Sequence, residues 1–87
     1  VQISNGIITA AISEVGAEVQ SLRCCKSGRE YMWHGDAKWW NGHSPILFPI
    51  VGGLWNGTCR IDGAELQISK HGFVRRATWR AIDVQAD

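Results

Sequence analysis

The chain has 87 residues, of which 45% are hydrophobic and 20% charged, and its formal net charge is +1. These proportions are typical of part of a soluble globular protein and exclude a disordered tail or a coiled coil. Lys and Arg are scattered, so we expect no nucleic-acid partner. The longest apolar run, residues 45–51, is far short of the ~20 residues of a membrane-spanning helix, and no signal peptide is visible at the start of the chain.

The cysteine pattern argues against both a disulfide framework and a metal knuckle. Cys24, Cys25 and Cys59 are odd in number, and two of them are adjacent. Free thiols in a reducing compartment are the simpler account, which predicts a cytoplasmic protein. His34 and His43, taken with Cys59, lack the short paired spacing of a zinc site, so no metal is expected.

The aromatic content exceeds what a small domain usually covers. Five tryptophans and two phenylalanines occur in 87 residues. We therefore expect either a partner surface or a further part of the polypeptide to pack on this segment.

The chain opens with a predicted β-hairpin. Residues 1–4 and 7–13 flank Asn5-Gly6, a pair that accepts the positive φ angles of a two-residue type I′ turn. Gly16 marks the next break, and residues 18–24 are taken as a strand. One face of the second strand is expected to carry Ile8, Ala10 and Ile12.

The middle of the chain mixes aromatic and polar residues. Residues 26–29 predict a polar turn and residues 31–33 a compact aromatic strand. Trp39 and Trp40 fall in a glycine-bounded loop, residues 36–42. Packing of this loop onto a core is favoured for the two rings over stacking on a ligand, and both alternatives stay open.

The second half predicts an edge segment, a sharp turn and two further strand signals. Pro45 and Pro49 exclude a central strand or a helix, because proline cannot donate to a ladder. Gly52-Gly53 allows a sharp turn or a close approach of the backbone. Asp62-Gly63 predicts a hairpin between residues 58–61 and 65–68. A last strand is predicted over residues 78–84, with Trp79 on one face and Ile82 and Val84 on the other. Short strands with frequent turns predict an all-β sandwich or barrel, and nothing predicts a long helix.

Two motifs give these residues a family resemblance. Residues 45–52, PILFPIVG, followed by residues 71–75, HGFVR, resemble the amino-terminal part of the aldose 1-epimerase (galactose mutarotase-like) family. The opening residues follow in the expected order, so the resemblance covers residues 1–87. It implies an all-β, antiparallel β-supersandwich, of which this chain is the amino-terminal segment of a single domain. It also implies a hexose in a cleft on one sheet, acid/base ring opening and no cofactor.

The resemblance assigns candidate roles to His71 and Arg75. His71 would hydrogen-bond a sugar oxygen near the reacting centre, and without the flanking motif it would be taken as a surface turn histidine. Arg75 would lie at the sugar cleft and donate to hydroxyls or to a phosphate, and a solvated strand-end charge is equally open. The sequence departs from the family pattern at Gly53, Val74 and Arg76, which affects substrate identity more than fold.

The base and a second histidine of the family are expected beyond Asp87. Asp62 serves its turn, and the other carboxylates sit in strand or turn contexts without a paired partner, so none is assigned as the base. The leading hypothesis is a sugar 1-epimerase, with the segment alone inactive. A non-catalytic carbohydrate-binding protein on the same fold and an interaction segment that buries its tryptophans against another chain are the alternatives.

Overall fold

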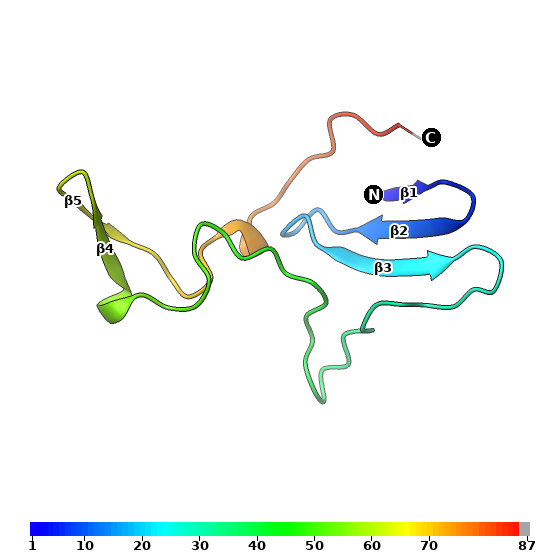
Figure 1. Ribbon diagram of the computed structural model, residues 1–87, viewed down its shortest axis with the longest axis horizontal. Coiled ribbons are helices and arrows are strands. Elements are labelled where there is room, and N and C mark those ends of the chain that lie inside the picture. The colour runs from blue at the N-terminus through cyan, green and yellow to red at the C-terminus, as the bar shows by residue number, and fades with distance from the viewer. Residues whose placement is uncertain (86–87) are drawn as a thin grey trace.

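The computed structural model describes residues 1–85, and within them short antiparallel strands alternate with turns and two single-turn 3₁₀ helices. In chain order the elements are β1 (Gln2–Ser4), β2 (Ile8–Ile12), β3 (Val19–Cys24), η1 (Trp55–Gly57), β4 (Thr58–Ile61), β5 (Ala64–Gln67) and η2 (Val74–Arg76). Figure 1 shows the β1–β2–β3 sheet at one end and the β4–β5 hairpin at the other, with η2 between them. The all-β prediction is confirmed. No helix within residues 1–85 has the length and apolar content needed to cross a bilayer.

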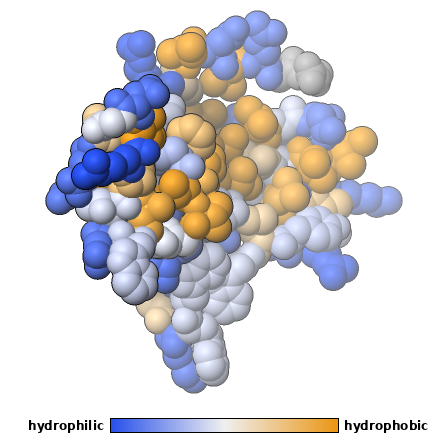
Figure 2. Space-filling view, turned by 60° about the vertical axis from the view of Figure 1, so that its left-hand side comes forward, coloured by the Kyte–Doolittle hydropathy of each residue, from blue (hydrophilic) through white to orange (hydrophobic). Residues whose placement is uncertain are grey.

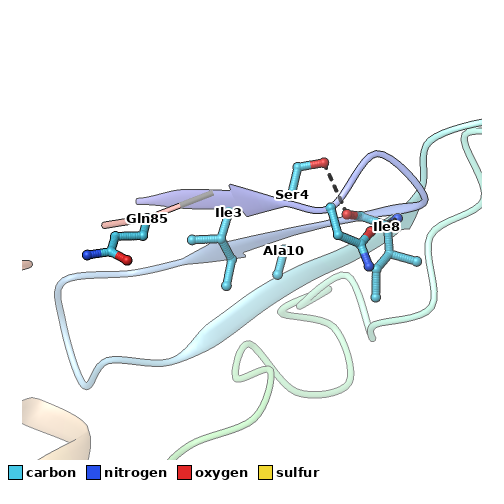
Figure 3. A pocket seen from close by; sticks show the side chains of 6 residues that line it. Ile3, Ser4, Ile8, Ala10 and Gln85 are labelled. Carbon is cyan, nitrogen blue, oxygen red and sulfur yellow. Dashed lines mark hydrogen bonds between the residues drawn. The ribbon is translucent and has the colours of Figure 1, made fainter. Parts of the chain in front are cut away.

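The three-stranded sheet is apolar on one face and polar on the other. Antiparallel pairing places Ile3 opposite Ala10 and Ala10 opposite Leu22, whereas Ser4 pairs with Thr9. Directly opposed residues share a face of the sheet, so the apolar pairs lie side by side. Figure 3 shows Ile3, Ile8 and Ala10 pointing to one side of the sheet and Ser4 to the other. The predicted apolar face of β2 is confirmed.

The first hairpin forms as predicted, but its turn does not. Gly6 has a φ of 84°, whereas Asn5 does not have a positive φ, so the loop is not the expected type I′ turn. The Asn5 side-chain oxygen instead accepts hydrogen bonds from the backbone N–H groups of Ile7, at 3.0 Å, and Ile8, at 2.9 Å. Asparagine often caps its own turn in this way, which the dipeptide alone does not reveal.

The second hairpin confirms its prediction. Asp62 and Gly63 have φ values of 50° and 78°, both in the left-handed region that a two-residue type I′ turn requires. Thr58 pairs with Gln67 and Ile61 with Ala64 around this turn. The hairpin therefore follows from local turn chemistry.

Two predicted strands are wrong. Residues 31–33 form no ladder, because the N–H of Met32 is taken by the Glu30 carboxylate, at 3.0 Å, after a single bridge between Arg23 and Glu30. Residues 79–84 are irregular: Thr78 makes one bridge to Val15, and no strand among residues 1–85 forms a ladder with the rest of the segment. A segment with alternating apolar residues does not become a strand unless another strand pairs with it through backbone hydrogen bonds.

Residues 1–85 enclose almost no core. Val74, at 7% exposure, is their one buried large hydrophobic residue, and all five tryptophans are exposed. The radius of gyration is 16.7 Å, against about 12 Å for a compact domain of this length. Figure 2 shows apolar side chains open on the surface of the molecule. The apolar surface that the composition predicted to need covering is uncovered in this segment.

Candidate functional site

The two sequence motifs lie side by side in space. Phe48 and Gly72 form a parallel bridge, and the Phe48 carbonyl accepts hydrogen bonds from the N–H groups of Phe73, at 3.0 Å, and Val74, at 3.4 Å. The Phe48-Pro49 peptide bond is cis. A Cβ at Gly72 would lie 2.0 Å from the Phe48 oxygen, so only glycine permits this approach. The proline-flanked run and the HGFVR segment therefore form one structural unit.

His71 is fixed to Gly52 by two hydrogen bonds. Its backbone N–H donates to the Gly52 carbonyl at 2.9 Å, and its ring Nδ1 accepts the Gly52 N–H at 2.8 Å. The residue is partly buried and has a φ of 65°. In a neutral imidazole, an Nδ1 that accepts a hydrogen bond leaves the ring proton on Nε2. The geometry thus makes His71 a hydrogen-bond donor through Nε2.

Arg75 is partly buried in η2, four residues after His71. Its Nη2 donates to the Lys70 carbonyl at 3.2 Å, which ties the side chain back to the residue before His71. Its Nε is buried and has no hydrogen-bond partner within residues 1–85. A buried guanidinium N–H without a partner costs free energy, so this atom has unused capacity to donate.

The paired tryptophans have contacts with residues near them in the chain. Trp39 is 71% exposed, with the Lys38 ammonium 5.0 Å from its ring centroid, so it packs on no core within residues 1–85. Trp40 is anchored through its carbonyl, which accepts a hydrogen bond from Trp33 Nε1 at 2.7 Å.

The two other histidines have local partners. The His43 ring lies against Gly35, where a Cβ would come within 2.7 Å of the ring, and His34 Nε2 is 3.9 Å from a carboxylate oxygen of Asp36. No group of three or more His, Cys, Asp and Glu side chains among residues 1–85 is arranged to hold a metal ion. A separate hollow, shown in Figure 3, lies beside β1 and β2 and contains neither His71 nor Arg75.

Two titratable groups outside the unit have shifted pKa values. Hydrogen bonds from the Ser21 hydroxyl first, and then from the Leu22 and Met32 amides, lower the pKa of Glu30 to about 2, and Arg23, 3.7 Å away, adds to the shift. Glu30 therefore has a hydroxyl, two amides and an arginine beside its carboxylate, which are contacts that the sequence pattern does not reveal. Hydrogen bonds from the Ser27 side chain and from nearby backbone lower the pKa of the Cys24 thiol.

Sequence reasoning missed the groups that hold the histidine. The double glycine indicated a sharp turn or a close approach, and Gly52 has a φ of 81°, but its partner His71 lies 19 residues away. The Phe48 carbonyl as an acceptor for residues 73 and 74 had no signal in the sequence, because every residue has a carbonyl. The motif residues were found, and the contacts between them were not.

Known proteins resemble this chain in sequence. The sequence model of the aldose 1-epimerase family matches residues 1–87. The plasmid-encoded protein LacX of Lactococcus lactis subsp. lactis is 36% identical over 89 residues, which cover 97% of this chain and 29% of LacX. The chromosomal LacX of the same organism is 35% identical with the same coverage. The chain thus spans about 29% of the length of these relatives.

Solved structures of two similar proteins superpose closely on this chain. A galactose mutarotase-like protein from Lactobacillus casei superposes with a TM-score of 0.90 at 38% identity, over 98% of this chain and 29% of that one. A galactose mutarotase related enzyme from Lactobacillus acidophilus gives a TM-score of 0.81 at 38% identity, over 90% and 26%. The antiparallel galactose mutarotase-like fold expected from the sequence is confirmed, with only its first part present here. This chain belongs to the aldose 1-epimerase family.

Proposed function

We propose that the protein containing this chain is a sugar 1-epimerase that interconverts the α and β anomers of an aldose or a hexose phosphate. The observation that carries the proposal is the hydrogen bond from the Gly52 N–H to His71 Nδ1, which leaves the ring proton on Nε2. A donor of this kind, fixed by backbone on one side, is suited to a sugar oxygen on the other.

The reaction opens and recloses a hemiacetal. One group removes the proton of the anomeric hydroxyl while another protonates the ring oxygen, and the steps reverse after rotation about the carbon–carbon bond. We assign His71 to a sugar oxygen near this centre, where its Nε2–H stabilises the developing charge. The base and the acid histidine would come from the part of the protein outside residues 1–87, so this segment alone would be inactive. The chemistry needs no metal or organic cofactor.

Arg75 would contribute to sugar binding. Its buried Nε lacks a partner within residues 1–85, and a guanidinium can donate to two oxygens of a hydroxyl pair or of a phosphate. Gly53 stands where many family members have an arginine, so Arg75 would supply a larger share of the cationic contacts here.

The rest of the protein would complete the domain. Residues 1–87 would be the amino-terminal segment of a single mutarotase-like domain, and the remaining strands would pack on the apolar face of β1–β2–β3. The partner is a small-molecule sugar.

The three cysteines are free, which fits a reducing compartment, and we place the protein in the cytoplasm on that basis.

The test is proton NMR saturation exchange between the α and β anomers of glucose, galactose and glucose 6-phosphate, with the full-length protein. We expect faster exchange for at least one of these sugars. We expect His71→Ala to reduce the rate by about 10²-fold, as is typical when a donor to a developing charge is removed.

His34→Ala is the matched control, because its side chain is exposed and pairs locally with Asp36. It should leave the rate unchanged. Sugar binding without any acceleration of exchange would instead establish a non-catalytic carbohydrate-binding protein on this fold.

A further inference from the structure

The turn between β2 and β3 contacts the two segments that form the candidate site. It comprises residues 13–18, and the Ser13 N–H donates to the Glu18 carbonyl at 2.8 Å to close it. Gly16, at its tip, is buried and has a φ of 73°, and Ala17 has a φ of 50°. Two consecutive left-handed residues make this a tight and conformationally specific turn.

On one side the turn holds the beginning of the proline-flanked run. One carboxylate oxygen of Glu18 accepts hydrogen bonds from the backbone N–H groups of His43, at 2.9 Å, and Ser44, at 2.8 Å. The Ser44 hydroxyl donates to the Val19 carbonyl at 2.6 Å. From Ser44 the run continues to Phe48 and Gly52, which hold the HGFVR segment and the His71 ring.

On the other side the turn holds the backbone of Arg75 and the residues that follow. A Cβ at Gly16 would lie 2.7 Å from the Arg75 carbonyl oxygen, and the Gly16 N–H donates to the Ala77 carbonyl at 2.8 Å. The Trp79 N–H donates to the Glu14 carbonyl at 2.7 Å. Gly16 is thus in direct contact with the main chain that carries the Arg75 guanidinium.

We propose that the turn of residues 13–18 is the positioning element of the sugar site, with Glu18 setting the His71 side and Gly16 setting the Arg75 side. The inference rests on the proposed function. Because one short turn holds both segments, a change at its tip displaces Arg75 from the substrate, and loss of the carboxylate releases residues 43 and 44. A displaced Arg75 weakens substrate binding, and a displaced donor on the His71 side lowers the efficiency of the reaction.

Gly16→Ala and Gly28→Ala in the full-length protein form a matched pair. Both glycines have a φ of 73°, but a Cβ at Gly28 meets nothing within 4 Å. The two substitutions therefore share the same left-handed φ, and only the Cβ of Gly16→Ala collides with Arg75. We expect Gly16→Ala to raise KM by about 10-fold with kcat within about threefold of the wild type, since Arg75 would bind ground state and transition state alike. Gly28→Ala should leave KM unchanged.

A double-mutant cycle separates positioning from general destabilisation. In the Arg75→Ala background, Gly16→Ala should raise KM no further. A purely structural effect would instead raise the KM of Arg75→Ala by the same factor as in the wild type. Glu18→Ala should lower kcat/KM by about 10-fold, and Glu18→Gln, which keeps an oxygen for both N–H groups, should recover it to within about threefold. Equal effects of Gly16→Ala and Gly28→Ala, or an additive cycle, would overturn the proposal.

A readout that needs no catalysis keeps the two proposals apart. The Arg75 Nε–H resonance in ¹H–¹⁵N spectra should shift in Gly16→Ala and not in Gly28→Ala, and the Ser44 amide should shift in Glu18→Ala more than in Glu18→Gln.

If wild-type protein accelerates no anomer exchange, the proposed function fails while these shifts still test the turn. If exchange is fast but the resonances and KM do not respond, the positioning role is wrong. Should Gly16→Ala fail to fold, the two Glu18 variants decide by the Ser44 amide and the recovery of kcat/KM.

Discussion

Glu30 holds the chain on both sides of the turn after β3 through its carboxylate. It accepts hydrogen bonds from the Ser21 hydroxyl and the Leu22 and Met32 amides, which lower its pKa from the ordinary 4.5 to about 2. A carboxylate whose pKa falls on folding stabilises the fold above its unfolded pKa, and this contribution is lost as pH falls through the folded pKa. The relevant window is therefore between about pH 4.5 and pH 2.

We predict that the full-length protein loses stability on acidification through this window more steeply than its Glu30→Gln variant. The amide cannot gain or lose a proton there, so the contribution of this one group disappears from the slope. Urea midpoints at a series of pH values measure the effect. Glu65→Gln, on the exposed strand β5, is the control and should follow the wild type. Parallel curves for wild type and Glu30→Gln would contradict the assignment.

The tautomer of His71 is a second prediction at the scale of the residue. The Gly52 N–H donates to Nδ1, so a neutral His71 ring should carry its proton on Nε2. Long-range ¹H–¹⁵N correlation spectra of the full-length protein distinguish the two tautomers directly. His71→Ala assigns the signals, and His34 serves as an exposed reference ring. A proton on Nδ1 would mean that the contact to Gly52 is absent and that Nε2 is no donor.

The elements differ in how far the sequence predicts them. The hairpin at Asp62-Gly63 follows from two residues, because their positive φ angles determine the turn. The strands predicted at residues 31–33 and 78–84 fail because a strand depends on partners that its own residues do not specify. The same limit applies to the site: His71 and Arg75 were identified from a motif, but the contacts of His71 with Gly52 were not.

At the scale of the element, Gly63 and Gly72 distinguish the cost of a strained backbone from the cost of a close contact. Gly63 has a φ of 78°, and a Cβ added there would meet nothing within 4 Å, whereas at Gly72, with a φ of 70°, the Cβ would lie 2.0 Å from the Phe48 oxygen. We predict that Gly63→Ala costs about 1 to 2 kcal/mol, the cost of left-handed backbone alone. Gly72→Ala should exceed about 3 kcal/mol, because a steric collision is added.

Urea unfolding of the two full-length variants measures these costs. Anomer exchange gives a second readout, because Gly72→Ala separates the two motifs and should reduce the rate more than its effect on stability requires. Equal stability losses for the two variants would show that the approach of Phe48 to Gly72 is not close in solution.

At the scale of the whole molecule, the sequence composition and the structure both indicate apolar surface that this segment does not cover. The apolar pairs Ile3–Ala10 and Ala10–Leu22 lie on one uncovered face of the sheet, and Val74 is the one buried large hydrophobic residue of residues 1–85. The hydrophobic effect is the main driving force of folding, and here little apolar surface is removed from water. The site is therefore built on a segment that depends on further packing for its stability.

We predict that residues 1–87, produced alone, do not hold the arrangement described here, whereas the full-length protein does. An amphipathic sheet with an exposed apolar face lacks the burial needed to offset the entropy of ordering the chain. The isolated segment should bind a dye specific for exposed apolar surface, show poorly dispersed amide resonances, and fold on addition of the remainder of the protein. A segment that unfolds cooperatively by itself and gives amide shifts equal to those in the full-length protein would show that the three-stranded sheet and the His71 unit are independent of the rest.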